Sequence, residues 1–207
     1  RSFAEPLAAA GVLAVLHRRN LQGALLLAGA GACHPIMTLP GVFASALIAS
    51  QRLWWRRPVH VALAAFAAFL LAWAWIDSRG LPAVDDAWYR IVRSNSPIVT
   101  ADAWRTVDWA RMLLPLVVLE CCARAAGGRL AVAWRTLALT GFAGLSMAVL
   151  AAITRWDLAL QAQFWRMGWL AAWAAPIAAL AAAAAARERP AARLTWLAAI
   201  PALAAPM

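Results

Sequence analysis

Two side chains near the start of this sequence are of types that transfer protons. Glu5 stands at the start of an apolar run, and His34 stands inside a second one, directly before a proline. A carboxylate can act as a general base or pair with a cation, and an imidazole can shuttle a proton or bind a phosphate. Each also has a structural alternative, because an acid stabilises the start of a helix and a histidine beside proline can stabilise a bend.

Three arginines and one glutamine are candidates for substrate binding. Arg90, Arg93 and Arg166 could each hold a phosphate group through paired N–H donors. Gln161 lies in the same polar patch as Arg166. Arginines beside apolar runs also contact lipid headgroups without specificity, and this alternative stands beside the first.

The adjacent acids Asp85 and Asp86 are the candidate metal ligands, because hard divalent cations bind carboxylate oxygen. A solvated turn is the alternative for such a pair. The cysteines have no metal-ligand spacing, and the sequence contains no Walker motif or glycine-rich dinucleotide loop. We therefore predict no cofactor other than a divalent cation at this pair.

Composition predicts the elements that must position these residues. The chain has 207 residues, of which 65% are hydrophobic and 14% are charged, too few polar groups to cover a soluble globule. A bilayer core about 30 Å thick needs roughly 20 apolar residues per helix. We predict an all-α fold, a polytopic transmembrane helix bundle with about six to eight membrane segments. The net charge of +10 comes from arginines that flank apolar runs, so we expect membrane lipids and no nucleic acid as partners.

We interpret residues 1–207 as a single transmembrane domain and as an internal fragment of a longer chain. The run 21–50 is uncharged but contains His34, Pro35 and Pro40, which predicts two short helices that meet near this bend as a broken or re-entrant pair. Further spans are predicted over 59–76, 130–153 and 169–186, and a last helix starts at 194. Small residues predict close helix contact in the second of these spans, namely Gly141, Gly144 and Ser146.

The longest polar stretch is the loop 77–109, where acids and arginines are mixed. Inside it we predict a short surface helix over 85–93, and Thr100 as the cap of the helix that follows. That next helix carries charges of alternating sign at intervals of three, which predicts ion pairs along one face: Asp102, Arg105, Asp108 and Arg111. Near its end, Glu120 and Arg124 have the spacing of an interfacial salt bridge.

The distribution of arginine predicts an orientation in a bacterial cytoplasmic membrane. If the loop 77–109 is outside, the inner segments hold ten arginines and one acid: 17–20, 51–57, 124–129 and 187–193. Cytoplasmic loops carry such an excess of positive charge. Glu5, the His34 bend, the loop 77–109 and the patch 155–166 would then share the outer face.

Several short motifs resemble those of a known class of enzyme. They are Arg1-Ser2-Phe3-Ala4-Glu5-Pro6, His34-Pro35, Leu39-Pro40-Gly41, the tryptophans from Trp104 to Trp109, and the later Gln161, Trp165 and Arg166. This layout resembles polytopic bacterial membrane proteins of the GT-C glycosyltransferase type. The resemblance implies a sugar donor linked to polyprenyl phosphate and a reaction at the outer face. The acidic catalytic residue of that family usually lies in the first outer loop, which would precede Arg1.

We therefore expect an integral inner-membrane protein that resembles a glycosyltransferase acting on a lipid-linked sugar. In this hypothesis Arg93 and Arg166 neutralise the donor phosphate, while Glu5 and His34 line the reaction chamber. Two alternatives stay open. A transporter or flippase would use the same broken helices to build its substrate site, and a membrane scaffold would have no catalytic activity.

Overall fold

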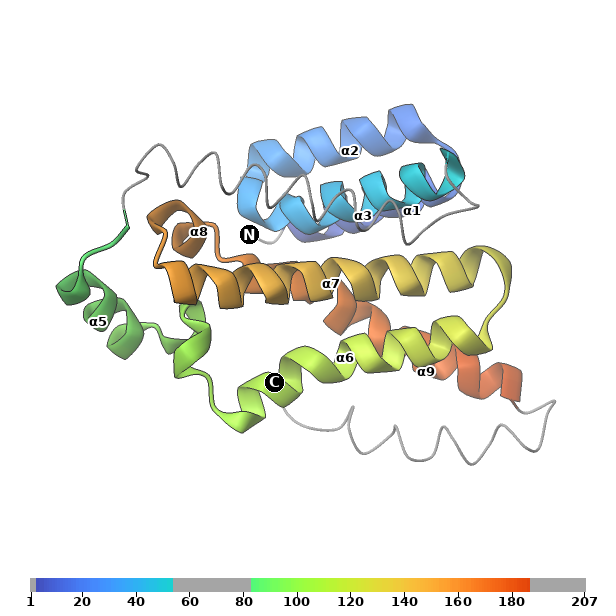
Figure 1. Cartoon of the computed structure of the whole chain (residues 1–207). Coiled ribbons are helices and arrows are strands. Elements are labelled where there is room, and N and C mark those ends of the chain that lie inside the picture. The colour runs from blue at the N-terminus through green and yellow to red at the C-terminus, as the bar shows by residue number, and fades with distance from the viewer. Residues whose placement is uncertain (1–2, 54–82, 187–207) are drawn as a thin grey trace.

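The computed structural model of this chain describes residues 3–53 and 83–186, and its regular elements there are helices (Figure 1). Strand pairing within those ranges is limited to one isolated bridge between Ala83 and Trp156. The all-α prediction is therefore confirmed for this part of the chain. The elements in chain order are α1 (Ala4–Leu16), α2 (Asn20–Cys33), α3 (Pro35–Leu53), α5 (Asp86–Asn95), η1 (Pro97–Val99), η2 (Ala101–Ala103), α6 (Thr106–Ala125), α7 (Gly128–Thr154), α8 (Asp157–Gln161), η3 (Phe164–Gly168) and α9 (Trp169–Ala186).

Two helical stretches are long and apolar enough to cross a membrane, judged by length and composition. They are Gly128–Thr154, which is α7, and Ala159–Ala185, which ends in α9. Each has 27 residues. The first is one α-helix about 40 Å long, whereas the second contains a turn and η3 before α9 begins. Long apolar helices also occur in the cores of soluble proteins, so these two do not establish the predicted six to eight membrane segments. The helices expected over 59–76 and from 194 onward lie outside the described residues.

The first three helices form a unit in which α1 packs against both α2 and α3. Small residues let these backbones approach closely. A Cβ atom on Gly23 of α2 would lie 2.5 Å from the side chain of Val15, and one on Gly41 of α3 would lie 3.1 Å from the Cβ of Ala8. The packing of this unit therefore requires glycine at both crossings of α1.

The predicted break between 21 and 50 falls at His34, whose extended backbone (φ −164°, ψ 98°) separates α2 from α3. The two helices run back from this point side by side (Figure 1). The expectation that Pro40 belongs to the bend is wrong, because α3 begins at Pro35 and continues through Pro40. Pro35 is the first residue of α3, where the missing N–H of proline costs no intrahelical hydrogen bond. The bend is therefore complete before the chain reaches Pro40.

The central helix of the remaining part is α7, which packs against α3, α6, α9 and η3. Its core with α6 and α9 includes Leu116, Leu119, Ala138, Ala171 and Ala175. A Cβ atom on Gly141 would lie 2.4 Å from the Leu116 side chain, and one on Gly144 would lie 2.4 Å from the Cβ of Met167. Close helix contact is therefore confirmed at both glycines. The prediction of close helix contact is wrong at Ser146, whose side chain is exposed.

The described bundle has two ends that hold different elements (Figure 1). We name one end the loop end, which holds the start of α1, the α2–α3 junction, α5 and α8. From α8 the chain continues through η3 toward the middle of α7, where Met167 meets Gly144. We name the opposite end the turn end, which holds the α1–α2 and α6–α7 turns. The arginine-rich segments 17–20 and 124–129 thus lie at one end, and the described part of the acid-containing loop lies at the other.

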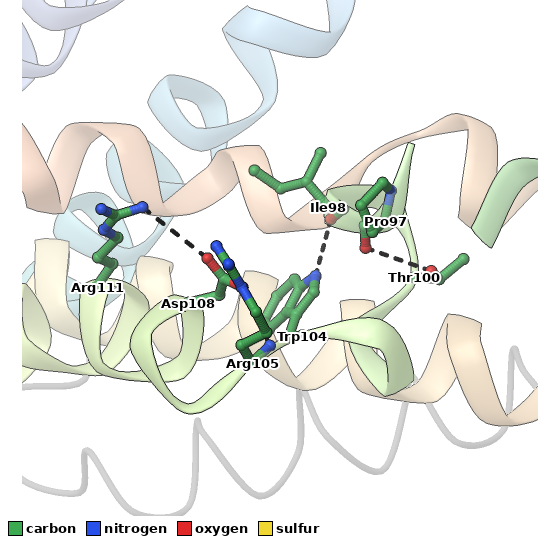
Figure 2. Close-up of polar contacts among 7 residues, drawn as sticks. All are labelled: Pro97, Ile98, Thr100, Trp104, Arg105, Asp108 and Arg111. Atoms are coloured by element: carbon green, nitrogen blue, oxygen red, sulfur yellow. Dashed lines mark hydrogen bonds and ion pairs between the residues drawn. The ribbon is translucent and has the colours of Figure 1, made fainter. Parts of the chain in front are cut away.

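The predicted surface helix of the loop is α5, which is capped by the Asp85 carboxylate accepting a hydrogen bond from the Trp88 N–H at 2.7 Å. The prediction that Thr100 caps the next helix is wrong. Its hydroxyl donates to the Pro97 carbonyl at 3.3 Å (Figure 2), and the short turn η2 follows before α6 begins. The α6 cap is made instead by the Asp108 carboxylate, which accepts a hydrogen bond from the Arg105 N–H at 3.0 Å.

Candidate functional site

Tyr89 joins α5 to the loop end of the bundle. Only 5% of its surface is exposed, and its ring packs with Ala151 of α7 and Leu160 of α8. Its hydroxyl donates to Asp102 Oδ1 at 2.8 Å and also lies 3.4 Å from the carbonyl oxygen of Ala152. One hydroxyl has one proton, and the shorter contact to a charged acceptor is the stronger of the two. Asp102 is therefore the main partner of Tyr89.

Two arginines balance the acids around Tyr89. Arg93 Nε lies 3.2 Å from Asp102 Oδ2. Arg155 forms an ion pair with Asp86, and its guanidinium carbon lies 4.8 Å from the centroid of the Tyr89 ring. These five residues form one network, which we name the Tyr89 network. It ties α5 to η2 and to the segment that follows α7.

The surroundings of Tyr89 disfavour its ionisation. Burial, the hydrogen bond to Asp102 and the charge of that carboxylate raise the pKa of Tyr89 from 10.0 to about 12. The cations Arg155 and Arg93 lower it, but by less. Tyr89 is therefore a neutral hydrogen-bond donor at physiological pH, and its role is to position α5.

Three members of the network, Tyr89, Asp102 and Arg155, are not among the candidate site residues that the sequence predicts. Tyr89 is the only tyrosine of the chain, and it lies in a charged loop. This position is a signal from which its polar contacts could be predicted. Asp102 was assigned to a helical stripe, but it precedes α6 and pairs with Arg93 instead. Arg155 has a left-handed backbone (φ 54°), and its carbonyl accepts a hydrogen bond from the Val84 N–H at 3.0 Å. No local pattern distinguished it from the other arginines.

The rest of the predicted charge stripe is present. Asp108 lies 3.4 Å from Arg105 Nε and 4.0 Å from Arg111 Nη1 (Figure 2). The backbone hydrogen bond from Arg105, together with the charges of both arginines, lowers the pKa of Asp108 below its usual value. This carboxylate is therefore ionised throughout the physiological pH range.

The candidate metal ligands Asp85 and Asp86 both have other partners. The first caps α5 and the second pairs with Arg155. Within residues 3–53 and 83–186, no group of three or more histidine, cysteine or acidic side chains is placed to hold a metal ion. Asp85 therefore stabilises the start of α5, and Asp86 helps to hold α5 against the segment after α7.

The four candidate substrate-binding residues lie on two different segments, three of them at the loop end and Arg166 on η3, beside the residue that packs against Gly144 of α7. On α5, Arg90 Nε donates to the Asp86 carbonyl at 3.1 Å, and Arg93 pairs with Asp102 as described. After α8, Arg166 Nε donates to the Gln163 side-chain oxygen, and its guanidinium carbon lies 4.7 Å from the centroid of the Trp165 ring. The fourth residue, Gln161, donates to the Asp157 carboxylate at 2.9 Å.

An apolar cluster connects the segments that carry Asp102 and Arg166. Its buried members are Ala101, Trp104, Leu145 and Ala148, and Trp165 packs against them. The Trp104 indole N–H donates to the Ile98 carbonyl at 3.0 Å (Figure 2), and its ring meets that of Trp109 edge-on at 5.0 Å. Trp104 thus holds the η1–η2 turns against α7 and η3.

The two candidate proton-transfer residues lie at the loop end of the three-helix unit. Glu5 is half-buried in the first turn of α1. His34 stabilises the bend, because its Nδ1 accepts a hydrogen bond from the Met37 N–H at 3.4 Å and its carbonyl accepts one from the Thr38 hydroxyl at 3.0 Å. The other ring nitrogen, Nε2, is the atom that His34 could offer to a ligand.

No known protein family, characterised protein or solved structure matches this chain at a significant level. The features of the chain that bear on its function are the geometry of the loop end and the distribution of polar residues along the helices.

Proposed function

We propose that this protein is a multi-pass protein of the bacterial cytoplasmic membrane whose loop end binds a lipid-linked, phosphate-bearing ligand at the outer surface. Such binding is the step that a GT-C-like glycosyltransferase would need before it transfers a sugar from polyprenyl phosphate. The proposal depends on one observation: the described helices α2, α3, α7 and α9 contain long segments without charge. No Asp, Glu, Lys or Arg occurs over 21–50, 136–154 and 167–186.

Exposed apolar side chains on the same segments support a membrane location. Phe142 on α7 and Trp173, Ile177 and Leu180 on α9 are each more than half exposed. Soluble proteins rarely leave such large apolar surfaces open to water. Lipid is a solvent in which this surface carries no penalty.

The arginines on α5 and η3 support a phosphate ligand. Arg90 and Arg93 are exposed on α5, and Arg166 is half-buried beside the Trp104 cluster. The ion pair between Arg93 and Asp102 does not prevent ligand binding, because an exposed pair contributes only about 0.2–1 kcal/mol. A bidentate bond to phosphate is stronger. Phosphate could therefore replace Asp102 as the partner of Arg93.

The position of the helix break favours this function over transport. A transporter site is typically built by helices that are interrupted near the middle of the membrane. Here the break at His34 lies at the loop end of the three-helix unit, beside the start of α1. The transporter or flippase alternative stays a hypothesis without an observation of its own.

A binding measurement with undecaprenyl phosphate tests the proposal. The whole chain is placed in lipid nanodiscs, and the affinity is compared between the wild type and the double variant Arg93→Gln/Arg166→Gln. Loss of two charged hydrogen bonds, each worth roughly 1.5–3 kcal/mol, should weaken binding at least tenfold. The control Arg18→Gln/Arg19→Gln removes the same charge from exposed residues at the turn end and should leave the affinity unchanged. Equal affinities in all three proteins, or equal losses in both variants, would contradict the proposal.

A further inference from the structure

Three charged residues meet near the turn end, on the flank shared by α6 and α7. The Glu120 carboxylate of α6 lies 2.9 Å from Arg124 Nε and 3.4 Å from Arg135 Nε, so the predicted Glu120–Arg124 salt bridge is confirmed and α7 adds a second arginine. We name these residues the Glu120 triad. Both guanidinium groups are at least half exposed, whereas two thirds of the Glu120 side chain is covered.

The triad has an excess of positive charge. One carboxylate serves two guanidinium groups, which leaves a charge of about +1 at the triad, and exposed Arg129 at the start of α7 adds another. A guanidinium with unsatisfied N–H groups at an exposed site is suited to a phosphate oxygen. The triad can therefore accept an anion without first losing its internal salt bridge.

The triad also marks the boundary between apolar and polar surface. Exposed Val117 and Leu139 lie one turn closer to the middle of the bundle, on the same two helices. Exposed Arg124 and Arg129 lie on the other side, toward the α6–α7 turn. A phospholipid has a matching order of groups, since its apolar acyl chains are followed by an anionic phosphate. Arginine at such a boundary extends its charged group toward the headgroup layer.

We infer that the Glu120 triad is a binding site for the phosphate headgroup of an anionic phospholipid in the inner leaflet. The inference rests on the membrane location proposed above, but it concerns the opposite end of the bundle and a different lipid. Arg124 and Arg135 bind the phosphate, the Glu120 carboxylate offsets part of their charge, and Val117 and Leu139 contact the acyl chains.

Lipid adducts counted by native mass spectrometry test the inference. The detergent-solubilised chain is titrated with phosphatidylglycerol or with phosphatidylcholine. Arg135→Gln should weaken phosphatidylglycerol binding at least fivefold. Glu120→Gln should instead strengthen phosphatidylglycerol binding at least twofold, because it removes a negative charge beside the bound phosphate. A merely structural role of Glu120 would not produce this effect. The zwitterionic lipid should respond to neither variant, and excess inorganic phosphate should not displace the bound lipid.

The outcomes separate this site from the loop end. If both variants leave phosphatidylglycerol binding unchanged, or shift it in the same direction, the triad is not a headgroup site. Displacement by inorganic phosphate would identify a general anion site and would also overturn the inference. The binding of undecaprenyl phosphate to the Arg93→Gln/Arg166→Gln variant depends on residues outside the triad, so either proposal can fail while the other stands.

Discussion

At the scale of single residues, Tyr89 shows how a small number of polar contacts positions a surface helix. It is the only buried residue of α5, so the helix is attached to the bundle by one ring and one hydroxyl rather than by an apolar face. The ion pairs on either side of it are exposed and individually weak. The hydrogen bond between Tyr89 and Asp102 is therefore the contact whose loss should change α5 most.

Titration of Tyr89 tests this contact directly. Its pKa of about 12 exceeds the ordinary 10.0, so the folded protein retains the proton more tightly than the unfolded chain. The contribution of this residue to stability is complete below pH 10 and is lost as the pH rises from 10 toward 12. Because the chain has one tyrosine, the rise in absorbance at 295 nm with pH reports the ionisation of Tyr89, above a constant contribution from the tryptophans. Asp102→Asn should lower the midpoint, and Arg155→Gln should raise it. A midpoint near 10 in the folded wild type would refute the burial and hydrogen bonding described here.

At the scale of elements, α7 depends on close contact with the segment η3. A Cβ atom on Gly144 would lie 2.4 Å from the Cβ of Met167 and 2.6 Å from the carbonyl oxygen of Phe164. Both contacts involve the backbone or atoms next to it, which cannot move away as the end of a long side chain can. The close approach of α7 and η3 positions Trp165 against Leu145 and Ala148 of α7, with Arg166 next to it.

We expect Gly144→Ala to destabilise the protein, because it overpacks this contact at a cost of about 1–3 kcal/mol. The matched control is Gly29→Ala in the middle of α2, where nothing lies within 4 Å of the added atom. The control should leave stability unchanged or raise it by up to about 1 kcal/mol, since alanine favours helix. Unfolding of both variants in mixed detergent micelles measures the difference. Equal stabilities would mean that α7 and η3 do not pack as closely as described.

At the scale of the whole molecule, the separation of charge into two ends determines how the bundle would lie in a membrane. The charge-free part of α7 runs between the Glu120 triad and the Tyr89 network. This part, residues 136–154, spans about 28 Å, close to the thickness of a bilayer core of about 30 Å. The two polar ends can therefore lie in opposite headgroup layers with the apolar surface between them in lipid.

Reporter fusions test that arrangement. An enzyme that is active only in the periplasm, inserted after Asn95, should be active, and the same enzyme inserted after Gly128 should be inactive. A reporter that is active only in the cytoplasm should give the reverse pattern at each position. Activity of one reporter at both positions would place α5 and the α6–α7 turn in the same compartment, and it would refute the proposed membrane function.

Properties that depend on residues close together in the chain could be read from the sequence. Helical structure, the break at His34, the surface helix α5 and the salt bridge from Glu120 to Arg124 all follow from local hydropathy, helix-breaking residues or spacing within one turn. The location of charge at two ends also follows, because it needs only the order of polar and apolar runs.

Only the tertiary structure decided which polar residues far apart in the chain become partners. Asp86 and Arg155 are 69 positions apart, and Tyr89 reaches Ala152 across 63. No local pattern encodes such a pair, because its distance depends on how α5 docks against the end of α7. For the same reason Asp102 pairs with Arg93 and not along a helix, since η1 and η2 turn the chain before α6 begins. The sequence determined where polar groups could lie, and packing between distant segments determined which of them meet.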